Sequence, residues 1–260
     1  MSDPMALAVA EVAAGRACVL ATVVSSERSV PRRAGSKMLV LADGRTVGSI
    51  GGGEMEARVV REASDALVDR MPRLRTYDLV DPATGDAGVC GGTATIYVEP
   101  CMPTATVYVI GCGHVGKAVA DLAHWSGFRV VVWDDRSDLV SPEVVPNADA
   151  CLTGSIADAL AAEPITTETH VVVVTRNISL DRSILPPLLA GGARTFGIMG
   201  SVRRWSTTRA QLAADGVPAD QLDCVRNPIG LELNAETPEE IAVSIIAEIV
   251  RTRRAESARR

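Results

Sequence analysis

The sequence predicts an α/β protein, in which an N-terminal mixed α/β domain precedes a C-terminal, Rossmann-like doubly wound parallel sheet. In the second half of the chain, short apolar runs alternate regularly with helix-forming segments, as they do in successive βαβ units. A G-x-G-x-x-G turn joins the first of these runs to the first helix. Hydrophobic residues make up 47% of the chain but aromatic residues only 3%, so Val, Ile, Leu and Ala must fill the cores. Such cores suit parallel strands that are buried on both faces.

The first domain is expected to cover residues 1–102. A helix is predicted over 3–15, and another over 54–70, where apolar residues recur at helical spacing. Strands are predicted over 18–24, 36–41, 46–50, 74–80 and 93–98. The second and third of these strands should form a hairpin, because Asp43 and Gly44 between them are typical turn residues.

The second domain is expected to cover residues 103–260, because Pro100 and Pro103 interrupt the periodicity just before its first strand. Its strands are predicted over 106–110, 129–133, 149–152, 170–174 and 194–198. Its helices are predicted near 115–126, 155–162, 179–190 and 202–214. A final helix should begin after Thr237, where Pro238 suits the first helical position and Glu240 completes a capping box.

The glycine turn after strand 106–110 is the clearest candidate for a ligand site. Gly111 permits a tight turn, Gly113 lets the backbone approach a phosphate, and Gly116 allows the helix to lie close to the strand. Asp134 stands roughly 20 residues further on, where a ribose-binding acid is expected in this motif. These features favour a phosphate-bearing ligand at the helix N-terminus. The alternative is that the glycines serve helix–strand packing alone and the crevice is empty.

Two further glycine-rich turns lie at predicted strand ends in the first domain. One is formed by Gly51, Gly52 and Gly53, and the other by Gly91 and Gly92. If these turns converge with the Gly111 turn on one cleft, the cleft offers many backbone donors and little side-chain bulk. That combination favours a large, planar, phosphorylated cofactor.

A second anion site is predicted where strand 194–198 meets the next helix. Gly200 and Ser201 bring backbone N–H groups and a hydroxyl to the helix start, and Arg203 and Arg204 bring positive charge. The alternative is a capped helix with solvated arginines.

Few side chains near these turns could carry chemistry. Cys90 is flanked by small residues that leave its sulfur accessible, and the position of Cys112 at a helix N-terminus should favour the thiolate. Either thiol can also be an inert, buried group. Glu54 and Glu56 can orient a ligand or exchange protons, or can simply complement the helix dipole, and His114 is open to the same two interpretations.

Composition and spacing exclude several classes of protein. A net charge of −6 argues against a general nucleic-acid binder, and no apolar stretch is long enough to span a membrane, so a cytoplasmic location is expected. The six cysteines form no C-x-x-C pair, which disfavours zinc ribbons, iron–sulfur clusters and a disulfide framework. Neither a Ser/His/Asp arrangement nor metal-ligand spacing is visible, so dedicated hydrolysis is not supported and no metal site is predicted.

Ordered motifs along nearly the whole chain resemble the XdhC/CoxI family, the accessory proteins of xanthine dehydrogenase, carbon monoxide dehydrogenase and other molybdenum hydroxylases. In the first half they are Ser29–Met38, Gly48–Glu56 and Cys90–Gly92. In the second half they are Gly113–Gly116, Trp133–Arg136, Gly197–Ser201, Pro228–Leu231 and Thr237–Ala242.

The resemblance implies a chaperone that binds molybdenum cofactor of the molybdopterin type, assists its sulfuration and inserts it into a hydroxylase client such as xanthine dehydrogenase. A cysteine desulfurase is a further implied partner, and a homodimer is expected because such a factor must present a cleft while it shields apolar surface. One motif departs from the family pattern. The family commonly has Thr-His-Asp after the fourth strand of the second domain, where this chain has Thr175, Arg176 and Asn177, although Asp181 remains.

Two other functions stay open on the sequence alone. One is an NAD(P)-dependent oxidoreductase, in which Asp134 would hold the ribose hydroxyls and Arg136 would contact a 2′-phosphate. This interpretation lacks an obvious proton donor. The other is an interaction module that binds neither nucleotide nor pterin.

Overall fold

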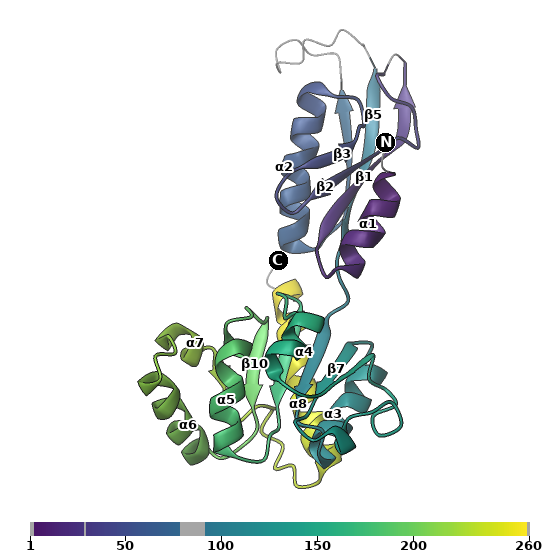
Figure 1. The fold of residues 1–260 in the computed structure, drawn as a ribbon. Helices are drawn as coiled ribbons and strands as arrows, with labels where there is room; N and C mark the ends of the chain where they lie inside the picture. The colour runs from purple at the N-terminus through teal and green to yellow at the C-terminus, as the bar shows by residue number, and fades with distance from the viewer. Residues whose placement is uncertain (1–2, 29, 79–91, 259–260) are drawn as a thin grey trace. The chain divides into compact units, whose positions relative to one another are not determined.

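The computed structural model describes residues 3–28, 30–78 and 92–258, with side chains as far as Arg254 (Figure 1). The chain divides into two compact units, Met1–Pro103 and Thr104–Arg259. Each unit has its own sheet and its own apolar core. The predicted site residues Cys90 and Gly91 lie outside the described residues.

The first unit is an antiparallel five-stranded sheet in the order β3-β2-β1-β5-β4, with a helix on each face (Figure 1). Its elements are α1 (Pro4–Ala13), β1 (Cys18–Glu27), β2 (Lys37–Leu41), β3 (Thr46–Gly48), α2 (Gly53–Asp69), β4 (Arg73–Asp78) and β5 (Thr93–Cys101). Met55, Val59 and Ala63 fix α2 to one face, because they follow one another at helical spacing and are all buried. Ala8 of α1 packs on the other face against Cys18 and Leu39. The mixed α/β architecture predicted for this half is confirmed.

One strand of this unit is longer than its sequence pattern indicates. β1 continues past the apolar run to Glu27, through a bulge between Val23 and Ser25. Backbone pairing with β5 extends over these last polar residues, from Ser25 opposite Thr95 to Glu27 opposite Thr93. Alternation of apolar side chains cannot reveal this extension, because backbone pairing and not burial holds it in place.

The second unit is a parallel six-stranded sheet in the order β11-β10-β9-β6-β7-β8. Its strands are β6 (Thr106–Ile110), β7 (Arg129–Trp133), β8 (Ala150–Leu152), β9 (Thr169–Val173), β10 (Thr195–Ile198) and β11 (Val225–Arg226). Its helices are α3 (His114–Trp125), η2 (a 3₁₀ turn, Ser137–Leu139), α4 (Ile156–Ala162), α5 (Ile178–Leu189), α6 (Val202–Ala214), α7 (Ala219–Asp223) and α8 (Pro238–Ala258). The predicted Rossmann-like sheet is confirmed.

Both faces of this sheet are buried, as the Val- and Ile-rich strands require. On β6, Val107 and Val109 face the layer that contains α3 and α8, whereas Tyr108 and Ile110 face the layer that contains α4 and α5. Figure 1 shows α3 and α8 together on one side of the sheet and α5 on the other. Among the described residues, no helix combines the length and the apolar character needed to cross a membrane.

The strand order reverses at the centre of the sheet. β6, the first strand of the unit, lies between β7 and β9, and the chain proceeds outward in both directions from there. The helices that follow β6 and β9 therefore pack on opposite faces of the sheet. The loops at the carboxyl ends of these two strands diverge from each other. In open α/β sheets, this switch point is where the ligand crevice forms.

Candidate functional site

The loop after β6 is held tightly between the ends of β7 and β9. The Gly111 N–H donates to the Trp133 carbonyl at 2.7 Å. Gly111 has a φ of +109°, and a Cβ atom there would lie 2.9 Å from the Val174 carbonyl oxygen and 3.3 Å from the Thr175 nitrogen. Only glycine suits both this conformation and this close approach.

Gly116 and Gly113 have different roles in the same motif. A Cβ atom on Gly116 would fall 1.8 Å from the Gly111 carbonyl oxygen, so its absence lets α3 approach the loop. Gly113 has an ordinary φ of −70°, and a Cβ atom there would meet no atom within 4 Å from any described residue other than its two chain neighbours. Neither packing nor backbone strain explains this glycine. It leaves open the space directly in front of the α3 N-terminus, where an approaching phosphate needs room.

The first turn of α3 offers hydrogen-bond donors to that space. Gly113 is the N-cap and supplies no side-chain oxygen, so the first N–H groups of the helix lack the acceptor that a capping side chain provides. The helix dipole adds partial positive charge at the same end. His114, the first residue of α3, is exposed beside these amides. The arrangement binds anions without needing a charged side chain.

Asp134 lies at the loop as predicted, but its carboxylate is already engaged. It is 1% exposed, and its Oδ2 accepts from the Cys112 N–H at 2.7 Å. Its Oδ1 accepts from the Arg136 N–H at 3.0 Å and from the Arg136 Nε at 2.9 Å. Asp134 thus anchors the glycine loop to β7, and a ribose could reach it only by displacing Arg136.

Of the two interpretations of Cys112, the structure favours the inert, buried thiol over the thiolate. The side chain is buried, and burial, followed by the negative charge of Asp134, raises the pKa of the Cys112 thiol to about 12. Desolvation therefore outweighs the helix dipole. Cys112 is a core residue of the α3 layer, and its contribution to the site is its backbone N–H.

The predicted second anion site is largely satisfied from within the protein. Ser201 caps α6, because its Oγ accepts from the Arg204 N–H at 3.2 Å, and a Cβ atom on Gly200 would contact the Arg204 side chain at 3.3 Å. The Arg204 guanidinium donates to the Thr175 Oγ1 at 3.0 Å and to the Asp181 Oδ2 at 2.6 Å. Arg204 thus ties the loops after β9 and β10 together, and its charge is not offered to an anion.

Sequence reasoning missed an ion pair between the loops after β7 and β9. The two Nη atoms of Arg176 donate to the two Oδ atoms of Asp135, each at 2.6 Å. The Arg176 guanidinium lowers the pKa of Asp135 to about 2. Both residues belong to segments that the sequence singled out, but only the strand order reveals that they meet.

The Gly51–Gly53 turn of the first unit is organised around Glu56. One carboxylate oxygen, Oε1, accepts from the Ser49 hydroxyl at 2.7 Å and from the N–H groups of Ile50, Gly51 and Gly52 at 2.8 to 3.2 Å. Burial raises the pKa of Glu56, but these hydrogen bonds outweigh burial and leave it below its usual value. Glu56 is therefore a fixed anion that orders the turn, which disfavours the predicted acid–base role.

The structure groups the predicted residues into two sets. Gly111, Cys112, Gly113, His114, Gly116, Asp134 and Arg136 lie at the carboxyl ends of β6 and β7 and the start of α3, at the switch point of the second unit, and Gly200 and Ser201 follow the strand next to β9. Gly51, Gly52, Gly53, Glu56 and the buried Gly92 belong to the first unit. Convergence of the two sets on one cleft stays a prediction.

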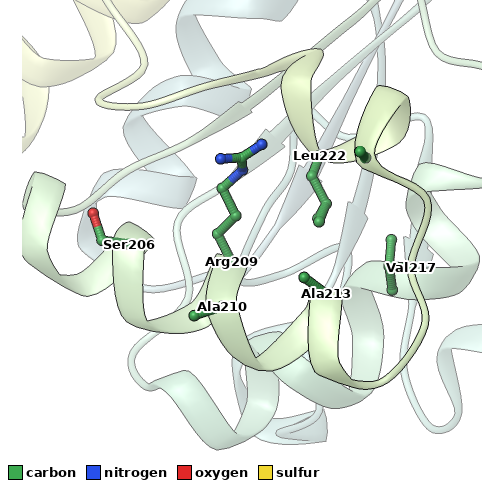
Figure 2. Close-up of a pocket in the computed structure, with 7 residues that line it drawn as sticks. Ser206, Arg209, Ala210, Ala213, Val217 and Leu222 are labelled. Carbon is green, nitrogen blue, oxygen red and sulfur yellow. The ribbon is translucent and has the colours of Figure 1, made fainter.

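Two hollows lie away from the strand ends. One, of about 320 Å³, is lined by residues of α6, of α7 and of the loop between them, Arg209 among them (Figure 2). Arg209 pairs with Asp223. The other, of about 550 Å³, lies between α3 and α8 and includes Lys117 and the exposed Trp125. The second hollow is also lined by His114 at the start of α3, but by none of the residues Gly111, Cys112 and Gly113.

Comparisons with known families cover most of the chain. Residues 107–249 match the family described as the XdhC Rossmann domain, and residues 11–78 match the XdhC and CoxI family.

Three curated proteins are similar in sequence to much of this chain. Uncharacterized protein YqeB of Escherichia coli is 33% identical, over 90% of this chain and 43% of its own. A probable xanthine dehydrogenase subunit of Bacillus subtilis is 30% identical, over 62% of this chain and 47% of its own. The molybdenum cofactor insertion chaperone PaoD of Escherichia coli is 21% identical, over 95% of this chain and 86% of its own. This chain thus spans less than half the length of the first two relatives.

A solved structure shares the fold. It is described as a xanthine dehydrogenase from Bacillus halodurans, and it superposes with a TM-score of 0.53 at 23% identity, over 98% of this chain and 96% of its own.

Proposed function

Because this chain belongs to the XdhC family, we propose that it is an accessory factor that holds a molybdopterin-type molybdenum cofactor at the Gly111–Gly116 crevice and inserts it into a molybdenum hydroxylase. The client is xanthine dehydrogenase or a related enzyme. Residues 1–102 are the XdhC/CoxI-type domain of this factor, and residues 103–260 are its Rossmann-like domain. Among the relatives, PaoD carries the name of an insertion chaperone for this cofactor.

The observation that carries the proposal is the unexplained openness at Gly113. Its backbone conformation is available to any residue, and apart from its two chain neighbours no described residue has an atom within 4 Å of the position that a Cβ would take. A molybdopterin carries a phosphate, and a phosphate can fill this space while it accepts from the N–H groups of the first turn of α3. The residues present therefore fit an anionic prosthetic group.

The chemistry around the crevice suits a carrier better than a catalyst. When bound, the cofactor supplies the molybdenum centre that the hydroxylase uses, and the chain's own residues bind and orient it. The Cys112 thiol stays protonated at neutral pH because its pKa is about 12. Asp134 is fully occupied by backbone and Arg136 donors. Reversible binding needs no proton-transfer group, so these side chains are free to hold the loop.

Sulfuration of the cofactor also belongs to the proposed role. Since the buried Cys112 is not a nucleophile, the sulfur would come from a partner such as a cysteine desulfurase, and this chain would hold the acceptor. A homodimer is the proposed assembly.

An NAD(P)-dependent oxidoreductase remains the second candidate, because the strand order is that of dinucleotide-binding sheets. Against it, the acid expected to hold the ribose is 1% exposed and bound to Arg136. A direct experiment separates the two. Purified protein is incubated in parallel with molybdenum cofactor, NAD⁺ and NADPH, unbound ligand is removed by gel filtration, and the retained ligand is identified.

We expect molybdenum cofactor to be retained and then to restore activity when the loaded protein is mixed with cofactor-free xanthine dehydrogenase. Retention of NAD⁺ or NADPH alone would support the oxidoreductase instead. Retention of no ligand would support an interaction module.

A further inference from the structure

An ion pair joins the segments that follow the two strands on either side of β6. Asp135 follows β7 and Arg176 follows β9, and β6 lies between those two strands. The preceding residues touch the loop from either side, because Asp134 accepts from the Cys112 N–H and the Thr175 nitrogen abuts Gly111. The two residues that come next, Asp135 and Arg176, make their contact with each other and so link the segments on either side of the loop.

The geometry of this pair is that of an arginine bound to an oxyanion. Two parallel N–H···O bonds of 2.6 Å join the guanidinium fork to both carboxylate oxygens. Phosphate accepts from arginine in the same bidentate manner. The Asp135 carboxylate therefore occupies the position that a ligand phosphate would take on Arg176.

The pair is also accessible and electrically balanced. The Arg176 side chain is 43% exposed and that of Asp135 is 32% exposed, so solvent and ligand can reach both. On the β7 side of the loop, Arg136 is neutralised by Asp134 in the same way. An incoming anion therefore meets two arginines, Arg136 and Arg176, each of which is paired with an aspartate. Of the two aspartates, only Asp135, the partner of Arg176, is partly exposed.

We propose that Arg176 is the phosphate-reading residue of the crevice, and that Asp135 holds it as an internal stand-in which the phosphate of the ligand displaces. The ligand chemistry is a phosphomonoester or diphosphate dianion. The inference rests on the proposed function for its biological ligand, but it concerns a residue contact that any small diphosphate can test. No bond is made or broken, because one oxyanion replaces another on the same guanidinium.

A purely structural role for the pair predicts a different result. If the pair only ties two loops together, removal of either partner loosens the crevice, and the two substitutions change anion affinity in the same direction. If Asp135 competes with the ligand, its removal frees Arg176 and tightens binding, whereas removal of Arg176 weakens it. The direction in which removal of the Asp135 carboxylate changes anion affinity therefore distinguishes competition with the ligand from a purely structural role.

Inorganic pyrophosphate is the probe, titrated into the full chain by isothermal calorimetry at low salt. We expect Arg176→Ala to weaken binding by about tenfold, as loss of a charge-assisted bidentate contact does. We expect Asp135→Ala to tighten binding by several-fold. In the Asp135→Ala, Arg176→Ala double variant this gain should vanish, which separates release of the arginine from a general loss of negative charge.

The matched control is Arg182→Ala. Arg182 forms an equally bidentate pair with Asp215, with both bonds at 2.5 Å, on α5 and the end of α6. Its removal should leave pyrophosphate affinity unchanged. Thermal unfolding of every variant should stay within a few degrees of the parent, because exposed ion pairs contribute little to stability.

The inference is overturned if Asp135→Ala weakens binding or leaves it unchanged, or if neither the parent nor Asp135→Ala binds pyrophosphate at millimolar concentration. Molybdenum-cofactor retention by the parent is measured beside the titration. Opposite effects of the two substitutions without cofactor retention would defeat the proposed function alone. Cofactor retention with equal effects of the two substitutions would defeat the Arg176 inference alone.

Discussion

Two opposing effects act on the thiol of Cys112, and their balance shows why the residue's role could not be read from its place in the motif. A helix N-terminus favours a thiolate by at most about 2 kcal/mol in the best geometries. Complete burial disfavours the charge by more, and the net result is a pKa of about 12. The motif shows the helix start but not the burial, because burial depends on packing against distant elements.

The first prediction concerns thiol reactivity. At pH 8 a small disulfide reagent should label the exposed Cys224 in the folded protein and should leave Cys112 unmodified until urea unfolds the chain. Peptide mass spectrometry after timed labelling measures both sites. Rapid labelling of Cys112 in the native protein would contradict the burial described here.

The second prediction concerns the pH dependence of the Asp135–Arg176 pair. Because the pKa of Asp135 falls to about 2 on folding, the pair adds stability at pH values above the ordinary aspartate pKa near 4 and loses it as the pH falls toward 2. With both side chains about a third or more exposed, solvent screening limits the effect to less than about 1 kcal/mol.

Urea unfolding of the parent and of Asp135→Asn, at pH 7 and then in steps from pH 4 to pH 2, measures this effect. The parent should be the more stable at pH 7, and the difference should shrink through the acid steps. The difference at pH 7 should also shrink in 1 M NaCl. A difference that grows on acidification would reverse the assigned sign.

At the scale of elements, prediction from sequence succeeded where periodicity is long. The β6 and β7 bounds agree with those expected, and α3, α4, α5 and α6 begin and end within one residue of them. The elements α7 and β11 were not predicted, because five and two residues are too short to show a period. β11 is defined by its parallel pairing with β10, in which Val225 lies opposite Phe196 and Arg226 opposite Gly197.

The third prediction tests the start of α8. The Thr237 Oγ1 accepts from the Glu240 N–H at 3.2 Å, and Glu240 accepts from the Thr237 N–H at 3.1 Å, which is the predicted capping box. Thr237→Ala should lower the free energy of unfolding by about 1 kcal/mol, whereas Thr237→Ser should preserve it. Urea denaturation followed by circular dichroism compares the two. Equal loss in both variants would show that the methyl group, and not the hydroxyl, matters.

At the scale of the whole molecule, each apolar cluster of the described residues draws on one unit only. The two clusters of the second unit pack both faces of the parallel sheet, and the two of the first unit pack its antiparallel sheet. A unit that buries its own core can fold alone. The candidate crevice at Gly111 lies wholly within the second unit.

The fourth prediction follows from this division. A chain of residues 104–260 should unfold cooperatively in urea and should bind pyrophosphate with the affinity of the full-length protein. The corresponding chain with Gly116→Ala should not fold, since its Cβ would meet backbone. A parent fragment that is unfolded, or that is folded but has lost its affinity, would show that the first unit completes the site.

The topology of the whole second unit explains why the sequence could reveal the glycine loop but not the Asp135–Arg176 pair. The glycine loop is contiguous and keeps a recognisable spacing. The Asp135–Arg176 pair joins residues that are 41 positions apart, and they meet only because the strand order reverses between β7 and β9. A pairing of that kind depends on topology and on the side-chain reach across a strand, which no local pattern encodes.

The central claim is that the open space at Gly113 receives the phosphate of a molybdenum cofactor. The measurement that tests it most directly is the molybdenum content per chain after gel filtration of cofactor-loaded Gly113→Val and parent protein. We predict that the variant folds, at a cost of about 1 kcal/mol for a poorer N-cap, and retains no molybdenum, while the parent is loaded. Equal molybdenum in both proteins would contradict the claim.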